Sequence, residues 1–551
     1  MPDGPLIVQS DRTVLLEVAH PEADGARHEL AVFAELERAP EHIHTYRITR
    51  LGLWNARAAG HTTEEILGTL ERYSKFATPQ SVSIDIAETV ARYGRLVIER
   101  QPDGVLTLRA TDSAVLAEIV KGKRIAPLLP SRLSDDMYVI EPWARGQLKQ
   151  ELVKLGWPAE DFAGYTPGTP HEITLDESDW HLRGYQQEAI DNFFERGSGV
   201  VVLPCGAGKT LVGAGAMATA KTNTLILVTN TVSARQWRSE LLRRTSLTED
   251  EIGEYSGQVK EVKPVTIATY QILTAKRKGA YAHLELLDAL DWGLVVYDEV
   301  HLLPAPVFKL TADLQARRRL GLTATLVRED GREGDVFSLI GPKRFDAPWK
   351  EIEAQGYISP ADCFEVRIDL PQRDRLVYAA ASDDERYRLA ATAPAKLDVV
   401  RRLVEKHAGE RILVIGQYLD QLDELADELG VPQLTGSTPI PERERLYQAF
   451  RDGDEPILVV SKVANFSVDL PEATVAIQVS GSFGSRQEEA QRLGRLLRPK
   501  ESGLSANFYT LVARDTVDQD FAQNRQRFLA EQGYSYTILD SETLGGHPVA
   551  A

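Results

Sequence analysis

A loop with spaced glycines is the first segment of this sequence that could bind a chemical group. The run LPCGAGKT occupies residues 203–210 and lies between the apolar run VVVL and the small-residue run LVGAGAMATA. Gly206, Ala207 and Gly208 stand where a strand would turn into a helix, so their backbone N–H groups can face phosphate oxygens. This context indicates a phosphate-binding loop rather than an ordinary glycine-rich turn.

The two residues that end the loop supply a charge and a hydroxyl. Lys209 would place a positive charge beside the phosphates, and the Thr210 hydroxyl can ligate Mg²⁺. Leu203 departs from the general GxxxxGK[ST] pattern, because it stands at the position of the first glycine. The Lys-Thr pair at a helix start still favours a site for ATP and Mg²⁺.

A pair of acidic residues further along the chain would complete the hydrolytic site. Asp298 and Glu299 follow an apolar run within LVVYDEVH. Ligands of open parallel sheets bind at the carboxyl ends of the strands, which is where both carboxylates would stand. Asp298 would hold Mg²⁺, and Glu299 would polarise the attacking water. The pair alone could equally cap the next helix, but a phosphate loop upstream favours catalysis.

Three polar residues near the C-terminal end share one helical face. In QRLGRLLR, residues 491–498, the spacing of Gln491, Arg495 and Arg498 is i, i+4 and i+7, and the leucines cover another face. An isolated arginine stripe is usually a solvated surface. Opposite ATP, planar guanidinium groups can instead stabilise the charge that develops on the transferred phosphoryl group.

Short apolar runs must position these residues. GVVVLP, TLILVT, VTIAT and LVVYD recur between helical patterns, and so do ILVIG, ILVV, VAIQV and FYTLV later in the chain. Runs without alternation are typical of strands buried on both faces of a parallel sheet. Two such sets predict an α/β protein with two tandem doubly wound lobes, lobe 1 over 176–355 and lobe 2 over 356–540, followed by a tail at 541–551.

The first part of the chain predicts two small mixed α/β domains, over 1–95 and 96–175. Strand-like runs alternate there with helix-like stretches such as HTTEEILGTLERYS, in which Ile66, Leu67 and Leu70 recur at helical spacing. The stretch AGYTPGTPHE is rich in glycine, proline and threonine, which is typical of a linker.

Composition limits the classes of function. Hydrophobic residues at 43% and charged residues at 26% predict a folded chain. The net charge of −18 counts against a protein that simply coats nucleic acid, although backbone amides and local cations can still contact phosphates. Cys205 and Cys363 belong to no CxxC or Cys/His cluster, and neither a secretion signal nor a long apolar stretch is present. We therefore expect the protein to reside in a reducing cytosol.

The motif order resembles superfamily 2 helicases. LRGYQQ, LPCGAGKT, TNTVSARQW, ATYQ, DEVH, TAT and QRLGRLLR follow one another in the order of that family. The resemblance implies two RecA-like lobes that close on ATP. It also implies that Arg183 and Gln186 engage the adenine, and that His301 of DEVH couples the nucleotide site to the other lobe, although an ordinary helix-start residue is an equal alternative.

More closely, the chain resembles bacterial members of the XPB family of repair and transcription helicases. LPCGAGKT with its cysteine, DEVH, LTATLVRED and SKVANFSVDLPEATVAIQVSG carry the likeness. It implies an ATP-dependent 3′-to-5′ DNA helicase serving repair, located on the nucleoid in the bacterial cytosol. Relatives work with a nuclease or within a large assembly, so a nuclease or repair protein is an implied partner. Cys205 is then a small buried residue of the loop rather than a redox centre.

The same resemblance assigns further segments. Its RED motif falls on Arg328, Glu329 and Asp330, which implies a role in DNA opening, whereas a charged surface loop is the alternative. The segment 371–395 stands where the family carries a thumb-like insertion, and a plain amphipathic helix is equally plausible. The domain at 1–95 resembles the family's N-terminal domain, and 96–175 occupies the place of its damage-recognition domain.

DNA would lie across both lobes, on a single-stranded or forked substrate. The contacting segments are TNTVSARQW, ATYQ with Thr269, LTGSTP, and SKVANFSVDLP with Ser461, whose hydroxyls and amides suit phosphate oxygens. Ala464 and Asn465 replace the Gly-Asp of eukaryotic relatives, which weakens transfer of that motif's phosphate-sensing role. Three alternatives stay open: a duplex translocase without processive unwinding, a nucleotide-gated repair scaffold, and an RNA-directed motor.

Overall fold

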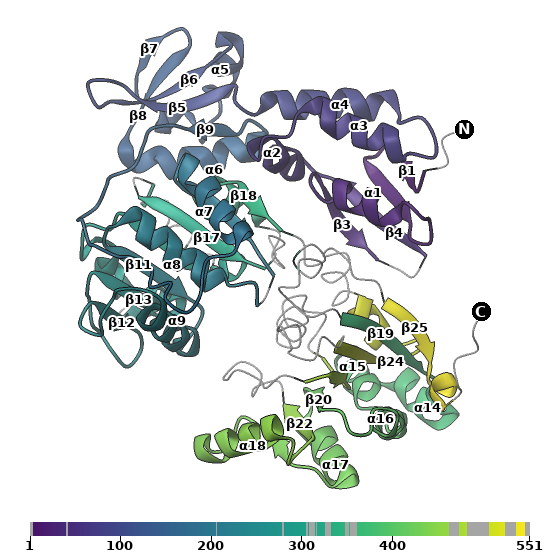
Figure 1. Ribbon diagram of the computed structural model, residues 1–551. Coiled ribbons are helices and arrows are strands. Elements are labelled where there is room, and N and C mark those ends of the chain that lie inside the picture. The colour runs from purple at the N-terminus through teal and green to yellow at the C-terminus, as the bar shows by residue number, and fades with distance from the viewer. Residues whose placement is uncertain are drawn as a thin grey trace.

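The computed structural model forms four units along the chain (Figure 1). It describes residues 4–39, 42–204, 206–277, 280–304, 307, 314–315, 317–324, 332–347, 352, 361–461, 473–481, 506–523 and 536–545. Two small mixed domains come first, and two parallel-sheet lobes follow. No helix within these ranges is both long and apolar enough to cross a membrane.

The first domain is an antiparallel four-stranded sheet, in the order β1-β2-β4-β3, with four helices. Its strands are β1 (Leu6–Val8), β2 (Thr13–Glu17), β3 (Ala34–Arg38) and β4 (Ile43–Ile48), and its helices are α1 (Ala23–Leu30), α2 (Arg50–Ala58), α3 (Thr63–Tyr73) and α4 (Gln80–Arg92). Helix α3 confirms the helix predicted around residues 61–74. It starts at a capping box between Thr62 and Glu65, and it buries Ile66 and Leu70.

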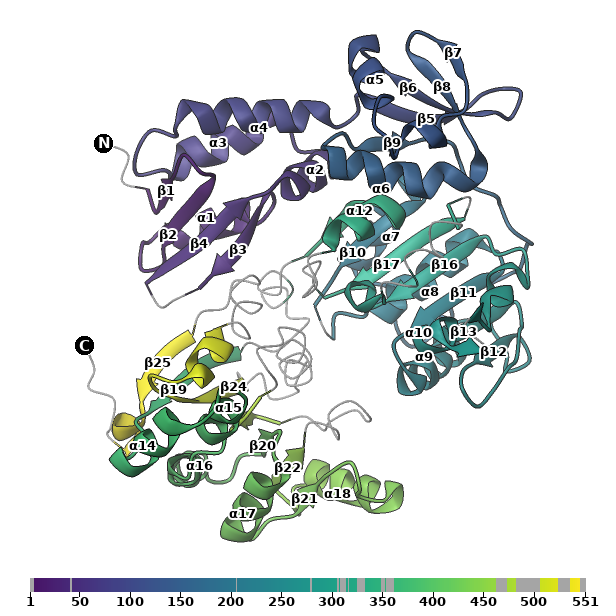
Figure 2. The ribbon, with the colours of Figure 1, turned by 180° about the vertical axis from the view of Figure 1, so that it is seen from behind.

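The second domain is a five-stranded sheet in the order β7-β8-β6-β5-β9. Its elements are β5 (Leu96–Arg100), β6 (Leu106–Ala110), α5 (Ser113–Ile119), η1 (Ala126–Leu128), β7 (Arg132–Ser134), β8 (Met137–Ile140), η2 (Pro142–Ala144), α6 (Arg145–Leu155) and β9 (Ala159–Asp161). Helix α6 lies against helix α12 (Glu333–Leu339) of lobe 1 (Figure 2). Gln150 Nε2 donates to Asp335 Oδ1 across this contact at 2.8 Å.

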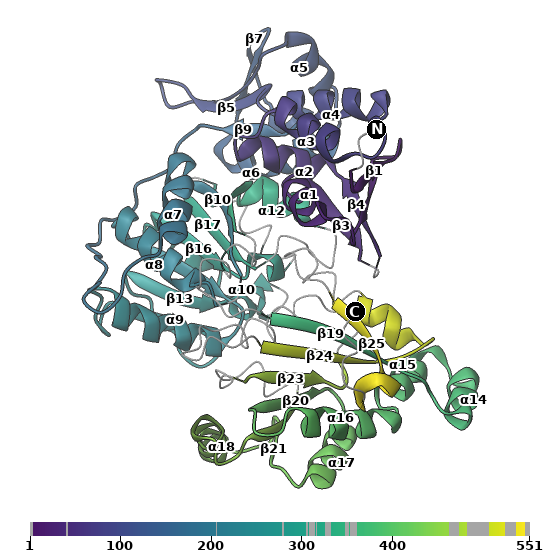
Figure 3. The same ribbon diagram turned by 45° about the vertical axis from the view of Figure 1, so that its right-hand side comes forward.

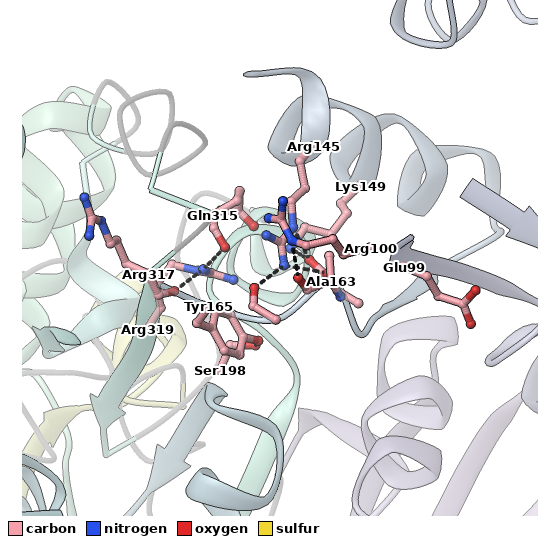
Figure 4. A network of polar contacts seen from close by, with 12 residues as sticks. Glu99, Arg100, Arg145, Lys149, Ala163, Tyr165, Ser198, Gln315, Arg317 and Arg319 are labelled. Carbon is pink, nitrogen blue, oxygen red and sulfur yellow. Dashed lines mark hydrogen bonds and ion pairs between the residues drawn. The ribbon is translucent and has the colours of Figure 1, made fainter. Parts of the chain in front are cut away.

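A buried charged cluster anchors the second domain to lobe 1 (Figure 4). Arg145 and Lys149 both contact Asp161, at 2.7 and 2.9 Å. The Tyr165 ring lies between two guanidinium groups, 5.9 Å from Arg145 and 5.6 Å from Arg319 of lobe 1. Burial lowers the pKa of Lys149 to about 7, because the positive charge is removed from water.

The stretch predicted as a linker lies along lobe 1. Thr169 N donates to Asp291 O at 2.9 Å, and His171 N donates to Lys221 O at 3.0 Å. Thr222 Oγ1 donates to Pro167 O at 2.9 Å. These bonds hold the connection against the lobe over several residues.

Lobe 1 is a seven-stranded, wholly parallel sheet in the order β12-β13-β11-β16-β17-β10-β18. The strands are β10 (Ser198–Val202), β11 (Thr224–Val228), β12 (Ile252–Tyr255), β13 (Val265–Thr269), β16 (Leu294–Asp298), β17 (Arg318–Thr323) and β18 (Lys343–Asp346). The helices are α7 (Gly184–Arg196), α8 (Lys209–Ala220), α9 (Thr231–Arg244), α10 (Tyr270–Thr274), η3 (Leu284–Asp288), η4 (Val300–Leu302) and α12, and a small hairpin joins β14 (Lys276–Arg277) to β15 (Ala280–Tyr281).

Lobe 2 repeats this architecture, with seven parallel strands in the order β21-β22-β20-β23-β24-β19-β25 (Figure 3). The strands are β19 (Ala361–Ile368), β20 (Ile412–Gly416), β21 (Gln433–Leu434), β22 (Ile457–Ser461), β23 (Val475–Gln478), β24 (Ala506–Ala513) and β25 (Tyr536–Asp540). The helices are α14 (Gln372–Ala380), α15 (Asp383–Ala391), α16 (Ala395–Lys406), α17 (Leu419–Leu429), α18 (Ile440–Asp452) and η5 (Ser541–Gly545).

The apolar runs of the sequence form the centres of both sheets. Strands β10, β11, β13 and β20 are buried at every residue. Helices cover both faces of such a sheet, so every side chain of a central strand packs against apolar neighbours. The predicted α/β fold with two doubly wound lobes is confirmed, and it brings the loops that follow the strands to one edge of each sheet.

Candidate active site

The phosphate loop leaves β10 and enters α8 at Lys209. Gly206 and Gly208 both have φ of +82°, in the left-handed region that glycine adopts without steric cost. A Cβ atom on Gly208 would lie 2.4 Å from Gln186 Nε2. Both the backbone conformation and this close approach therefore require glycine at position 208.

Lys209 and Glu299 meet at the edge of the sheet although they lie on different loops. Lys209 Nζ is 3.4 Å from Glu299 Oε1, and it donates to Leu203 O at 3.4 Å. Glu299 has φ of +49°, which costs a non-glycine residue roughly 1 kcal/mol or more. The surrounding structure holds this conformation, and it places the carboxylate beside the lysine of the loop.

The two neighbouring carboxylates have pKa values that are shifted in opposite directions. Burial, and then the charge of Glu299, raise the pKa of Asp298 to about 6. Burial also acts to raise the pKa of Glu299, but Lys209 and His301 outweigh it, and the net pKa is lowered. Such a split is typical of acidic pairs with separate roles in a site. Glu299 is therefore held ionised, whereas for Asp298 burial and the charge of Glu299 outweigh the attraction of Lys209.

Neither acid behaves as a helix cap. Asp298 Oδ2 accepts a hydrogen bond from Trp237 Nε1 at 3.0 Å. Glu299 occupies the N-cap position of η4 but makes no side-chain capping bond. The alternative that the pair merely caps the next helix is therefore wrong. Thr210, the expected metal-binding hydroxyl, lies in the first turn of α8 and is half-buried.

His301 extends the site toward the end of β17. Its Nδ1 lies 2.6 Å from Thr323 Oγ1 and 3.5 Å from Glu299 Oε2. The side chain is buried, although His301 lies in the short helix η4 directly after Glu299. Thr323 belongs to lobe 1, and these two contacts link Glu299 to the TAT segment within one lobe.

The residues expected at the adenine hold the phosphate loop in place. Gln186 Nε2 and Tyr185 Oη each donate to Ala207 O at 2.8 Å. Gln186 Oε1 accepts from Arg183 N at 2.9 Å, and Arg183 Nη1 donates to Tyr185 Oη at 3.2 Å. The N-terminus of α7 and the loop are therefore one bonded unit.

Sequence reasoning missed four supporting residues. Trp237 binds Asp298, Tyr185 binds the phosphate loop, Thr323 binds His301, and Tyr270 Oη donates to Asp298 O at 2.7 Å. Each lies inside one of the helicase motifs, namely TNTVSARQW, LRGYQQ, TAT and ATYQ. An aromatic or hydroxyl residue inside a motif was the available signal, but its partner depends on the fold.

Two hydroxyls expected to contact DNA are buried. Thr269 ends β13 and Ser461 ends β22, each with only 2% of its surface exposed. Ser461 Oγ makes no hydrogen bond to any residue that the structure describes. Both lie at the carboxyl edge of their sheets, but neither side chain is presented to solvent.

Several predicted site residues lie outside the described residues. These are Cys205, Arg328, Glu329, Asp330, Ala464, Asn465, Gln491, Arg495 and Arg498. The described half of the nucleotide site therefore belongs to lobe 1.

The segment expected as a thumb forms the helices α14 and α15 at the outer end of lobe 2 (Figure 3). Helix α14 buries none of its residues, and Leu376 is 67% exposed. Tyr387 of α15 is buried, and its hydroxyl donates to Gly481 O. Tyr378 Oη accepts from Val517 N at 2.9 Å. Both tyrosines are therefore engaged by the protein itself.

Three known families match the chain in adjoining regions. The family described as "Helicase conserved C-terminal domain" matches residues 6–134. "Type III restriction enzyme, res subunit" matches residues 179–328. "ERCC3/RAD25/XPB C-terminal helicase" matches residues 352–545.

Relatives match over almost the whole length. A DNA 3′-5′ helicase XPB of Kineococcus radiotolerans is 67% identical over 546 residues, which cover 99% of this chain and 98% of that protein. The protein of that name in Mycobacterium tuberculosis is 63% identical, over 99% of this chain and 100% of its own. The General transcription and DNA repair factor IIH helicase/translocase subunit XPB of Antonospora locustae is 35% identical, over 97% of this chain and 81% of its own. The resemblance seen in the motifs is confirmed, and the chain belongs to the XPB family of DNA 3′-5′ helicases.

Proposed function

We propose that this chain uses ATP hydrolysis to move along DNA from 3′ to 5′ and to separate its strands. The observation that carries the proposal is the contact of Lys209 with Glu299 beside a glycine-bent phosphate loop. A lysine for phosphate and an ionised carboxylate for water are the two side chains that phosphoryl transfer to water needs on one side of ATP.

Mg²⁺ fits the neighbouring residues. Asp298 is a buried carboxylate with a raised pKa, and a divalent cation would stabilise its charged form. Thr210 and Asp298 would hold the ion, which supplies charge neutralisation for the phosphates when it is bound. Trp237 keeps one carboxylate oxygen of Asp298 in a fixed direction.

Glu299 is our candidate for the residue that orients and polarises the attacking water. Its ionised state suits that role, and His301 with Thr323 fixes the other end of the carboxylate. Lys209 would bind the phosphates, with Gly206, Ala207 and Gly208 offering backbone N–H groups. Arg183 and Gln186 would contact the adenine from the unit that they form with the loop.

Lobe 2 would complete the site. We infer that Gln491, Arg495 and Arg498 face the phosphates when the lobes close, so that hydrolysis and lobe opening are coupled. DNA would bind across both lobes, and Arg328, Glu329 and Asp330 would act where its strands part. A repair role on the bacterial nucleoid, with a nuclease or another repair protein as partner, belongs to the same proposal.

Steady-state ATPase measurements test the proposal. We expect turnover to rise with single-stranded or forked DNA and to rise little with RNA, and Lys209→Ala to abolish it. The RNA arm tests the RNA-directed alternative. A turnover that no DNA changes would reject both the helicase and the translocase and would favour the nucleotide-gated scaffold.

A duplex translocase is the second candidate, and the name of the Antonospora relative, helicase/translocase subunit, favours keeping it. Two substrates separate the candidates: a forked duplex, and a blunt duplex carrying a displaceable third strand. Strand separation on the fork supports the helicase. Displacement of the third strand without fork opening supports the translocase.

A further inference from the structure

The turn that follows β21 is closed by its own polar groups. Within residues 435–438, Thr438 N donates to Thr435 O at 3.2 Å, and Thr435 N donates to Thr438 Oγ1 at 3.0 Å. The hydroxyl oxygens of Thr435 and Ser437 lie 2.8 Å apart. Ser437 itself is exposed. The turn therefore has a fixed shape and presents its tip to solvent.

A buried arginine supports this turn from behind. Arg443 of α18 is only 8% exposed, and its Nη2 donates to Thr435 O at 3.3 Å and to Thr438 O at 3.1 Å. Its Nε is buried without a hydrogen-bond partner among the described residues. Buried cations are usually paired with a carboxylate. Among the described residues, the guanidinium of Arg443 instead donates to two backbone carbonyls of one turn.

The contact changes what the turn offers to an anion. Backbone carbonyl oxygens repel a phosphate, but oxygens already bound to a guanidinium repel it less. The buried charge also adds a positive potential beneath the turn, where the local dielectric is low and electrostatic effects are strong. An arginine in this place can favour a phosphate without touching it.

The position of the turn points to the same ligand. Strand β21 pairs in parallel with β22, with Leu434 opposite Val460, so the turn begins beside the carboxyl end where Ser461 stands. That edge is where ligands of open parallel sheets bind. Ser461 was expected to face DNA, and the turn contains the LTGSTP segment that was expected to do so too.

We propose that Arg443 is a positioning residue for DNA binding, which holds the turn 435–438 in the shape that accepts a backbone phosphate. The inference rests on the proposed function, because it takes DNA as the ligand of this edge. The guanidinium acts through the two carbonyls and makes no contact with the DNA.

Arg445 provides a matched control on the same helix. Its side chain is 60% exposed and pairs with Glu442 at 2.8 Å. Its hydrogen bonds among the described residues go to Glu442 and not to the turn. Arg445→Gln removes the same charge from the same helix. A general effect of charge on DNA attraction would therefore appear in both variants.

The experiment measures binding of a fluorescein-labelled duplex with a 3′ single-stranded tail by anisotropy at several salt concentrations. We expect Arg443→Gln to raise the Kd about tenfold, since hydrogen bonds from a charged group are lost. Turnover at saturating DNA should stay within about twofold, and Arg443→Lys should be intermediate. The dependence of log Kd on log salt should keep its slope, because no phosphate contact is removed.

Three results would overturn the inference: an unchanged Kd in Arg443→Gln, an equal rise in Arg445→Gln, or a slope reduced by about one phosphate contact. The last result would make Arg443 a direct ligand. If Arg443→Gln does not fold, Arg443→Lys decides, because it keeps the charge and loses the planar double contact. A wild-type protein that does not bind this DNA would reject the proposed function itself, together with the inference.

Discussion

Each lobe places a lysine close to the carboxyl ends of its parallel strands, and the two lysines are bonded very differently. In lobe 2, Lys396 Nζ donates to Val479 O at 2.8 Å, to Leu511 O at 3.0 Å and to Asp518 Oδ2 at 2.8 Å. The side chains of Lys396 and Asp518 are almost wholly buried. Three short bonds match the three N–H groups of an ammonium, so this lysine is saturated by the protein.

In lobe 1, the lysine of the phosphate loop makes longer contacts with Leu203 and Glu299. Lys209 Nζ lies 3.4 Å from both Leu203 O and Glu299 Oε1, and 11% of its side chain is exposed. Bonds of this length are weak compared with those near 2.8 Å. The comparison teaches that one architecture can place a lysine at its strand ends either within a buried ion pair or beside a phosphate loop.

The strongest test of the site formed by Lys209 and Glu299 in lobe 1 is Glu299→Gln. We expect ATP turnover to fall by about 10² to 10⁴, since the variant keeps the shape of the side chain and loses the base that polarises water. ATP binding should persist, which a fluorescent nucleotide would measure. Loss of binding together with turnover would mean that Glu299 mainly orders Lys209 and the loop.

Changes to the buried pair of Lys396 and Asp518 in lobe 2 should alter the stability of the lobe. Lys396→Met leaves Asp518 buried without its cation, so the free energy of unfolding of lobe 2 should fall by about 3–5 kcal/mol. Chemical denaturation monitored by fluorescence would measure it. The double variant Lys396→Met/Asp518→Leu is the control, and it should recover much of the loss. A double variant as unstable as the sum of both changes would contradict a sealed ion pair.

Lys149 is buried, as Lys396 is, and it extends the comparison to the effect of pH. Its folded pKa is about 7, below the ordinary value of 10.5, so above pH 7 the unfolded chain binds more protons than the folded chain. The free energy of unfolding should therefore rise with pH, by about 2 kcal/mol between pH 7 and 9. Lys149→Met should lose this rise, whereas Lys154→Met, on the exposed side of α6, should keep it.

The smallest expected effect concerns the support of Glu299. Thr323→Val removes the hydroxyl that contacts His301 and preserves the side-chain volume. We expect turnover to fall by about tenfold, which corresponds to about 1.4 kcal/mol, while the fold stays intact. Thr224→Val, at the amino end of β11, tests for a general effect of losing a buried threonine hydroxyl. An unchanged turnover in Thr323→Val would contradict the role of His301 in supporting Glu299.

The sequence was most informative where local pattern and fold agree. Buried strands such as TLILV have no polar alternation, so both lobes could be predicted. The spaced glycines and the Lys-Thr pair of LPCGAGKT are typical of a phosphate loop, so the position of Lys209 could be predicted too. The helical spacing of Ile66, Leu67 and Leu70 likewise placed a helix in the first domain.

The rest depends on contacts between distant segments, which no local pattern encodes. The bond from Trp237 to Asp298 joins residues 61 positions apart, and it forms only when helix α9 packs against the end of strand β16. Thr269 and Ser461 show the converse, since their hydroxyls suit phosphates by type, and only the fold shows that packing at the strand ends buries them. Sequence indicated the edge of each sheet, and the tertiary structure decided which side chains reach it.

The most direct test of the account is strand displacement on two partial duplexes that differ only in the polarity of the single-stranded tail. We predict that the protein with ATP and Mg²⁺ displaces a strand from the 3′-tailed duplex, does so poorly from the 5′-tailed one, and fails on both as Lys209→Ala. Displacement of equal extent without ATP, or by Lys209→Ala, would contradict the claim that the loop of lobe 1 drives movement along DNA.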